Sequence, residues 1–202
     1  MVTGTNGEIG KALVKALLAK GVAKIYAAAR TKGAPRCKPG TGSDLVVAVK
    51  LDITVGSEVS AAVKQCGDVD VLINAAGIKR WMTLPGAAGL EAARVEMEVN
   101  FFGTLDMCLA FAPVLAARGG GTMVNVCAAY LVNLPLNGKH RASLAARNIQ
   151  VIRAYPGPGP EGATARQQAY HTVPGLVADA ILTGMENDQA DIVLIPRFQE
   201  QE

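Results

Sequence analysis

Short runs of apolar residues alternate along the chain with longer segments in which apolar residues recur every three to four positions. The short runs are typical of strands buried on both faces, and the longer spacing is typical of amphipathic helices. Strands are predicted at Val2–Thr3, Ile25–Ala29, Leu45–Leu51, Val69–Ile73, Thr122–Val126, Gln150–Ala154 and Ile192–Ile195. Helices are predicted from Ile9 onward and over Ser57–Gln65, Glu91–Ala117, Arg141–Arg147 and Val177–Met185.

Strands that alternate with helices favour a parallel sheet covered by helices on both faces. We therefore expect an α/β fold of the Rossmann type, a doubly wound parallel sheet in three layers. The pattern continues without a repeat or a second domain, so residues 1–202 are expected to form a single domain. In such a fold, ligands bind outside the carboxyl ends of the strands.

Composition and charge narrow the class of protein. Of the 202 residues, 50% are hydrophobic and 4% aromatic, as in parallel sheets packed under helices of small residues. The formal net charge is +3 and the basic residues are mostly scattered, which argues against a nucleic-acid partner. We find no signal peptide and no apolar span of about 18 residues, so we expect a soluble, cytoplasmic protein without a membrane partner. The four widely spaced cysteines favour reduced thiols and no metal site.

A glycine-rich turn follows the first strand, with the sequence Thr3-Gly4-Thr5-Asn6-Gly7-Glu8-Ile9-Gly10, and leads directly into a helix. Such a turn directs backbone N–H groups and the positive end of the helix dipole toward one point, which suits a pyrophosphate. Glycine is needed there because a β-carbon would hold the phosphate away from the backbone. An ordinary glycine-rich turn explains this octapeptide equally well, because short glycine motifs are weak signals.

Polar and glycine residues also follow the predicted ends of successive strands. Gly4, Arg30, Asp52, Asn74 and Gly77 lie at these ends. Because the carboxyl ends of parallel strands meet at one edge of the sheet, we expect these five residues to face one crevice.

With these motifs in place, the chain resembles the short-chain dehydrogenase/reductase family over nearly its whole length. Thr3–Gly10 resembles the family's glycine motif in the spacing of its extended and atypical members, since the commoner spacing has Gly where Glu8 stands. Leu51–Thr54 resembles the adenine-contacting segment, and Leu72–Gly77 the Asn-Asn-Ala-Gly motif with Ala75 in place of the second Asn. Val99–Thr104 resembles the helix that carries the active-site Asn.

The resemblance implies a set of residues that bind the cofactor and an oxidoreductase acting on a small-molecule carbonyl or secondary alcohol. The implied cofactor-binding residues are Gly4, Thr5, Asn6, Gly7, Ile9, Gly10, Arg30, Asp52, Ile53, Asn74, Ala75, Ala76, Gly77, Pro156 and Gly157. The loop at residues 156–172 corresponds to the family's lid over the substrate.

Arg30 bears on the choice of nicotinamide cofactor. An acidic residue after the second strand accepts hydrogen bonds from the ribose 2′-OH and repels a 2′-phosphate, whereas an Arg can bind that phosphate. Lys11, Lys32 and Arg36 lie near Arg30 in the sequence or the expected fold. NADP is therefore favoured over NAD, with a solvated loop charge as the alternative interpretation of Arg30.

The catalytic residues match the family only in part. Asn100 matches the active-site Asn, but Ala128 occupies the Ser position and no Tyr-x-x-x-Lys sequence is present. One alignment of Gly138–Ala146 places His140 at the Tyr position. The other matches Arg141–Ala146 to the end of the same helix, so that the Tyr-to-Lys portion is missing between Lys139 and Arg141. We prefer the second alignment because it leads directly into the strand Gln150–Ala154.

The connection after the fifth strand is short. Ala129–Ile149 comprises 21 residues, enough for a crossover, which needs at least about 10–12 residues, but with room for only two or three helical turns. Two interpretations follow: an NADP-dependent oxidoreductase, or a dinucleotide-binding protein without catalysis. The sequence does not separate a degenerate family member from a chain that lacks some of its residues, although Ala128 favours the former.

Family members commonly assemble by packing two long helices against their symmetry mates. One of these helices is Glu91–Ala117, with an apolar stripe at Val95, Val99, Phe102, Leu105, Leu109 and Ala112. The other is shortened here to roughly Arg141–Arg147. We therefore expect a homo-oligomer that is weaker than those of its relatives, because a two-turn helix cannot cover a stripe eight turns long.

Overall fold

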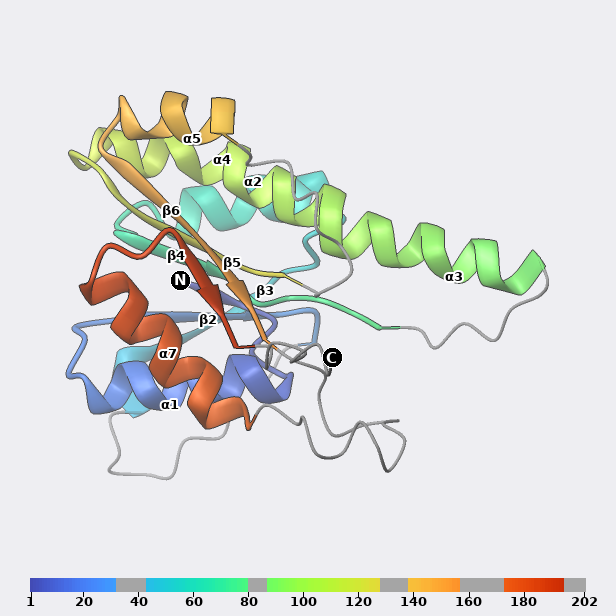
Figure 1. The fold of residues 1–202 in the computed structure, drawn as a ribbon, viewed down its shortest axis with the longest axis horizontal. Coiled ribbons are helices and arrows are strands. Elements are labelled where there is room, and N and C mark those ends of the chain that lie inside the picture. Colours follow the sequence, from blue (N-terminus) through green and yellow to red (C-terminus); the bar gives the residue numbers. More distant parts are fainter. Residues whose placement is uncertain (32–42, 80–86, 128–137, 157–172, 195–202) are drawn as a thin grey trace, which may run out of the picture.

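The computed structural model describes residues 1–31, 43–79, 87–127, 138–156 and 173–194. These residues form one seven-stranded sheet in the order β3-β2-β1-β4-β5-β6-β7, in which every pair of neighbouring strands is parallel. The strand order reverses between β1 and β4, as in a doubly wound Rossmann sheet (Figure 1). The predicted fold class is confirmed.

Each strand coincides with one of the short apolar runs of the sequence. The strands are β1 (Val2–Thr3), β2 (Ile25–Ala29), β3 (Val46–Lys50), β4 (Val71–Asn74), β5 (Gly121–Val126), β6 (Ile149–Tyr155) and β7 (Asp191–Val193). The helices are α1 (Glu8–Ala19), α2 (Gly56–Gln65), α3 (Ala87–Met97), α4 (Thr104–Ala117), α5 (Gly138–Ala145) and α7 (Pro174–Glu186). Two further stretches are the 3-10 turn η1 (Ser43–Leu45) and the π-helical η2 (Glu98–Gly103), which joins α3 to α4.

The sheet lies between two helical layers. Helices α1 and α7 lie together on one face, and α2, α4 and α5 cover the other (Figure 1). Each face has its own apolar core: Leu13, Ile152 and Ile181 belong to the first, and Leu72, Phe111 and Met123 to the second. Alternate residues of each central strand therefore enter opposite cores, which explains why these strands are apolar throughout.

Several boundaries differ from those predicted. Strand β4 begins at Val71 rather than Val69 and includes Asn74; Val69 is apolar because it is buried in the core, although it lies outside the strand. Helix α5 begins three residues before the predicted Arg141 and ends at Ala145. Asn148, in the turn that leads from α5 to β6, has a left-handed backbone conformation (φ 57°). Strand β7 begins at Asp191, and the predicted end of this strand, Ile195, lies outside the described residues.

Among the predicted elements, the helix Glu91–Ala117 differs most from the element in the structure. It begins four residues earlier, at Ala87, and its middle is a π-helical stretch that contains Asn100. A π turn inserts one extra residue and so rotates the faces on either side of it. The predicted apolar stripe does not form one buried face: Ala112 is buried in the core, whereas Phe102 and Leu109 are 53% and 61% exposed.

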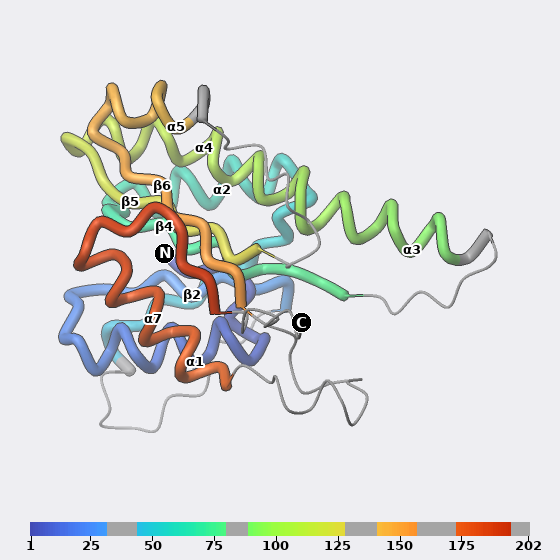
Figure 2. Tube along the Cα trace, viewed as in Figure 1, coloured from blue at the N-terminus to red at the C-terminus, as the bar shows by residue number. Residues whose placement is uncertain are grey.

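The same helix corrects our expectation that the chain has no long apolar span. The helical segment Gly89–Ala117 is long and apolar enough to cross a membrane by length and composition, and 39% of its apolar window is buried inside the protein. Figure 2 shows α3 running out beyond the sheet while α4 lies against it. Core helices of soluble proteins pass the same test, so this span is weak evidence for a membrane segment.

Candidate functional site

A pocket of about 860 Å³ lies at the carboxyl ends of β1 to β4, at the reversal of strand order. Nine of the predicted cofactor-binding residues line it: Gly4, Asn6, Gly7, Arg30, Asp52, Ile53, Ala75, Ala76 and Gly77. Leu51 and Thr54, which belong to the predicted adenine-contacting segment, also line it. The lining residues that were not predicted to bind the cofactor are Ala29, Thr31, Ile78, Val95, Glu98 and Val99. Val95 and Val99, predicted for an oligomer interface, thus face the pocket.

The glycine turn that joins β1 to α1 passes close to the loop after β4, and only glycine fits there. Gly4 has φ +70°, and a β-carbon there would lie 2.6 Å from Ala76 Cα. The Gly7 N–H donates to Gly4 O (2.9 Å), which closes the turn before α1. No side chain caps the start of α1, so the backbone N–H groups of its first turn are available to an anionic group in the pocket.

Two loops form the wall on the side of β2 and β3. The Asn6 side-chain amide donates to Thr31 Oγ1 (2.8 Å) and so connects the glycine turn to the loop after Arg30. Asp52 Oδ1 accepts hydrogen bonds from the Thr54 N–H (3.0 Å) and hydroxyl (2.7 Å). Burial raises the Asp52 pKa, but these hydrogen bonds and the charge of Arg30 lower it by more, so the pKa lies below its ordinary value. Asp52 is therefore an ionised acceptor beside a cationic Arg30.

Asn100 connects the long helix to the loop after β4. Its side-chain amide donates to Ile78 O and accepts from the Ile78 N–H, both at 2.8 Å. A β-carbon on Gly77 would lie 3.2 Å from Asn100 Oδ1, so the loop passes close over this side chain. The structure thus places the predicted catalytic Asn next to the pocket wall, inside the π-helical stretch.

Other predicted binding residues lie beneath the pocket. Thr5 is fully buried and its hydroxyl donates to Ala28 O (3.2 Å). Gly10 is buried against the Gly4 carbonyl, and Ile9 packs against the core of α1 and α7. Asn74 is the last residue of β4 rather than a residue beyond it; it is 2% exposed and its amide donates to Asn125 Oδ1 (2.9 Å). These residues shape the turn and hold the strands together without lining the pocket.

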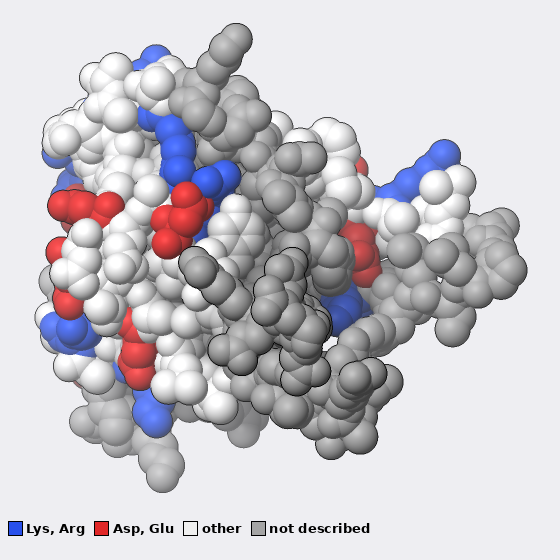
Figure 3. Space-filling view, viewed as in Figure 1, with Lys and Arg blue, Asp and Glu red and all other residues white. Residues whose placement is uncertain are grey.

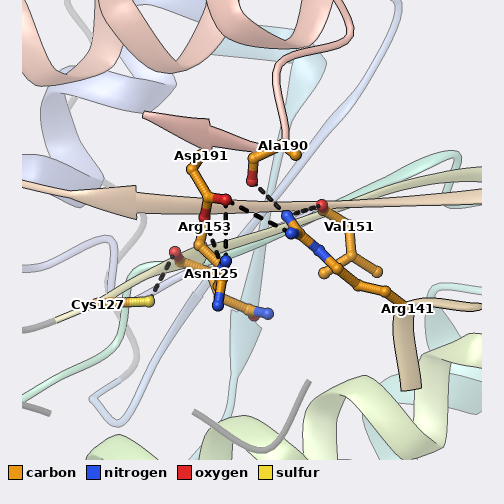
Figure 4. A network of polar contacts seen from close by, with 7 residues as sticks. All are labelled: Asn125, Cys127, Arg141, Val151, Arg153, Ala190 and Asp191. Carbon is orange, nitrogen blue, oxygen red and sulfur yellow. Dashed lines mark hydrogen bonds and ion pairs between the residues drawn. The ribbon is translucent and has the colours of Figure 1, made fainter. Parts of the chain in front are cut away.

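Polar residues near the carboxyl ends of β5 and β6 form a network that sequence reasoning missed (Figure 4). Arg153 binds both carboxylate oxygens of Asp191 (2.6 and 2.9 Å). Arg141 reaches from α5 to the carbonyl oxygens of Val151 (2.8 Å) and Ala190, and to the Asp191 carboxylate (3.5 Å). The signal in the sequence is Arg153 itself, the one charged residue of the strand Ile149–Tyr155.

This network fixes the position of α5, the helix in the short crossover between β5 and β6. Helix α5 has eight residues, about two turns, as predicted. Arg141 anchors it to the edge formed by β6 and β7. Directly after β5, the Cys127 thiol donates to Asn125 O (3.3 Å), and burial raises the pKa of this thiol to about 12. Cys127 is therefore a neutral core thiol rather than a nucleophile.

The remaining predicted site residues are described in part or not at all. Pro156 is half-buried directly after β6. Ala128, Gly157 and nearly all of the predicted lid at 156–172 lie outside the described residues. The backbone of His140 belongs to α5, and its side chain is not described. Within the described ranges, no three His, Cys, Asp or Glu side chains are grouped so as to hold a metal ion.

Comparisons with known proteins place this arrangement in context. A structure of a short chain dehydrogenase from Burkholderia cenocepacia J2315 in complex with NADP matches with a TM-score of 0.85 and 33% identity, covering 98% of this chain and 88% of that one. The 3-ketodihydrosphingosine reductase of Bacteroides thetaiotaomicron is 31% identical over 147 residues, 71% of this chain and 52% of that protein. Retinol dehydrogenase 16 of Homo sapiens is 34% identical over 135 residues, 62% of this chain and 41% of that protein.

The chain spans about half the length of the curated relatives that it matches. The family model described as short chain dehydrogenase matches residues 1–134, which contain the glycine turn, Arg30, Asp52 and Asn100. Those are the residues around the pocket at the reversal of strand order. A sheet, a pocket and a family match that coincide in this way identify the chain as a member of the short-chain dehydrogenase/reductase family.

Proposed function

We propose that this chain is an NADP-dependent oxidoreductase that acts on a carbonyl group or a secondary alcohol. The dinucleotide would occupy the pocket at the carboxyl ends of β1 to β4. The observation that carries the proposal is that the uncapped start of α1 and the Arg30 side chain border the same pocket.

The residues of the pocket fit the chemical groups of NADP. The N–H groups at the start of α1 suit the pyrophosphate, and the Arg30 guanidinium suits a 2′-phosphate. The ionised Asp52 is an acceptor for an amino or hydroxyl group of the adenosine, and Ile53, Val95 and Val99 offer an apolar wall to its ring. The Burkholderia cenocepacia relative, which has 33% identity to this chain, carries NADP.

The chemistry of the site divides between cofactor and protein. When bound, the nicotinamide supplies or accepts the hydride. This chain's own residues bind the dinucleotide and fix its orientation, and Asn100 holds the pocket wall at Ile78. Relatives named as reductases and dehydrogenases support catalysis, and the small-molecule substrate class follows from those names.

A non-catalytic dinucleotide-binding protein is the second candidate. It is favoured by Ala128 at the Ser position, by the absence of Tyr-x-x-x-Lys from the sequence and by the two-turn α5. In the first candidate, a group such as His140 would have to replace the missing proton donor.

We also propose a cytoplasmic protein without a nucleic-acid partner. Cys66, Cys108 and Cys127 are buried free thiols, which supports a reducing compartment. Figure 3 shows acidic and basic side chains side by side on one face, without a broad patch of one sign among the described residues there.

Titration of the purified chain with NADPH and NADH, followed by nicotinamide fluorescence, tests the proposal. We expect NADPH to bind more tightly, and adenosine 2′,5′-bisphosphate to displace it at lower concentration than 5′-AMP. Equal affinities for the two dinucleotides would refute the assignment of Arg30 to the 2′-phosphate. Absence of binding by both would refute the dinucleotide site.

A further inference from the structure

The middle of the long helix is held at two points by two different loops of the pocket. Asn100 is held by its pair of hydrogen bonds to Ile78, in the loop after β4. Gly103, the last residue of η2, lies against Ile53, in the loop after β3. Both loops line the pocket. The π-helical stretch therefore contacts both the loop after β3 and the loop after β4, the two loops that line the pocket.

The contact between Gly103 and Ile53 is unusually close. A β-carbon on Gly103 would lie 2.8 Å from Ile53 Cγ1, 3.0 Å from Cδ1 and 3.1 Å from the Ile53 carbonyl oxygen. Gly103 is buried and Ile53 is only 4% exposed, so neither side can move into solvent. Any residue larger than glycine at position 103 would push the helix away from the loop.

A π turn needs such support because its hydrogen bonding is less favourable than that of an α-helix. The extra residue that it inserts determines which way Asn100 points. If the turn reverted to α-helical geometry, the Asn100 side chain would rotate away from Ile78 by about 100°, the rotation of one residue in a helix of 3.6 residues per turn. The register of η2 thus decides whether Asn100 reaches the loop after β4.

We propose that Ile53 and Gly103 are positioning residues for Asn100. Their contact holds η2 in its wide turn, and the wide turn directs Asn100 to Ile78. Because Ile53 also borders the pocket, a dinucleotide seated against the loop Asp52–Thr54 stabilises the same contact. The last step rests on the proposed function, whereas the positioning of Asn100 does not.

Three variants test the contact: Gly103→Ala, Ile53→Ala and the double variant. The single substitutions should each loosen η2, the first by overpacking and the second by leaving a cavity, and the added methyl group should fill that cavity in the double variant. The readout is hydrogen exchange of the Ile78 amide, which donates to Asn100 Oδ1. We expect exchange about tenfold faster in each single variant and substantial recovery in the double variant.

Two controls separate positioning from general loss of stability. The Cys127 amide, which donates to Ala154 O in the sheet (2.7 Å), should be much less affected than that of Ile78. Gly175→Ala adds a methyl group to a helical glycine with no atom within 4 Å of the new carbon, and should change neither amide. If Gly103→Ala does not fold, slower Ile78 exchange in the double variant than in Ile53→Ala still supports the proposal.

Equal acceleration at Ile78 and Cys127, or no recovery in the double variant, would overturn it. These measurements are made without cofactor, so they stand even if the protein binds no dinucleotide. NADPH titration of the same variants then tests the link to the pocket. Each single variant should bind NADPH several-fold more weakly and the double variant should recover; unchanged affinity in a variant whose Ile78 amide exchanges faster would refute that link alone.

Discussion

At the scale of single residues, Arg30 and Asp52 give the pocket its polarity. Both line it, and the charge of Arg30 contributes to the lowered pKa of Asp52. A guanidinium in this place offers a 2′-phosphate a charge-assisted, two-pronged partner. We therefore expect the choice between the two nicotinamide dinucleotides to depend chiefly on the Arg30 side chain.

Arg30→Asp should reverse the preference between NADPH and NADH. The substitution removes a favourable contact with the 2′-phosphate and adds a repulsive charge, so NADPH should bind at least about tenfold more weakly, as expected for loss of a charged hydrogen bond. Fluorescence titration of both dinucleotides measures the change. Arg147→Asp, at an exposed position after α5, is the matched control. An unchanged preference in Arg30→Asp would contradict the assignment.

Asp68 shows a residue-scale effect away from the pocket. Its carboxylate accepts hydrogen bonds from Lys24 Nζ (2.6 Å) and from the Tyr26 hydroxyl (2.7 Å), both on the segment that leads into and begins β2. These bonds, with that from Lys24 the larger cause, lower the Asp68 pKa from 3.8 to about 2. A carboxyl with a lowered folded-state pKa stabilises the fold above its unfolded value and loses that effect as pH falls.

The stability difference between wild type and Asp68→Asn should therefore depend on pH. It should be constant above about pH 5 and shrink as pH falls from about 4 toward 2, because in that window the Asp68 carboxylate binds a proton in the unfolded chain more readily than in the folded protein. Urea unfolding of both proteins between these pH values measures it. Asp179→Asn, at an exposed position on α7, is the matched control. A difference at pH 2.5 as large as that at pH 5 would mean that the two hydrogen bonds do not depend on ionised Asp68.

At the scale of elements, the short helix α5 between β5 and β6 bears on which of the two candidate functions is correct. Helix α5 is about two turns long and is anchored by Arg141 to the edge of β6 and β7. The residues of this helix, Gly138–Ala145, include no Tyr, so the helix does not supply a Tyr and a Lys four residues apart. The loss of proton transfer would thus follow from an element rather than from one substitution.

Reductase activity separates the two candidate functions: the non-catalytic candidate predicts no more than trace carbonyl reductase activity, and the oxidoreductase candidate predicts turnover. Loss of the general acid typically slows catalysis by about 10²–10⁴-fold, and the Ser and Lys positions are also unfilled. Steady-state oxidation of NADPH with a panel of ketones measures this. Robust turnover that disappears in His140→Ala but persists in His171→Ala would show that a histidine has taken over the role, and that the alignment placing His140 at the Tyr position is the correct one.

At the scale of the whole molecule, the long helix leaves apolar surface on its outer side. Phe102 and Leu109 are 53% and 61% exposed on η2 and α4, on the layer that also holds the short α5. Contiguous exposed apolar surface favours association. With only two turns of α5 beside it, this surface supports a weak dimer better than a stable tetramer.

Light scattering through a sizing column over a dilution series should show a dimer that dissociates on dilution. Leu109→Arg places a charge in the apolar surface and should give a monomer at every concentration. Leu176→Arg, at a 60% exposed position on α7, should behave like the wild type. A tetramer that persists at the lowest measurable concentration would contradict this view of the interface.

The fold class and the order of strands and helices could be predicted from the sequence alone, because they depend on local signals. Nine of the residues around the pocket followed from the resemblance to the family. Apolar runs specify buried strands, and the glycines of Thr3–Gly10 specify a turn that no larger residue can form. Even the short crossover follows from counting residues. The strands and the glycine turn are each encoded within a few positions of the chain.

The direction in which the sequence neighbours of those residues point depends on packing between distant parts of the chain. Asn74 is buried against Asn125 because β4 extends one residue further than its apolar run. Val95 on α3 and Val99 on η2 face the pocket, whereas Phe102 on η2 is exposed. In our proposal, the contact between Gly103 and Ile53, fifty residues apart in the chain, holds the π turn of η2. Arg141, Arg153 and Asp191 meet from three elements. Contacts between residues so far apart in the chain leave no local period in the sequence, so packing alone selects them.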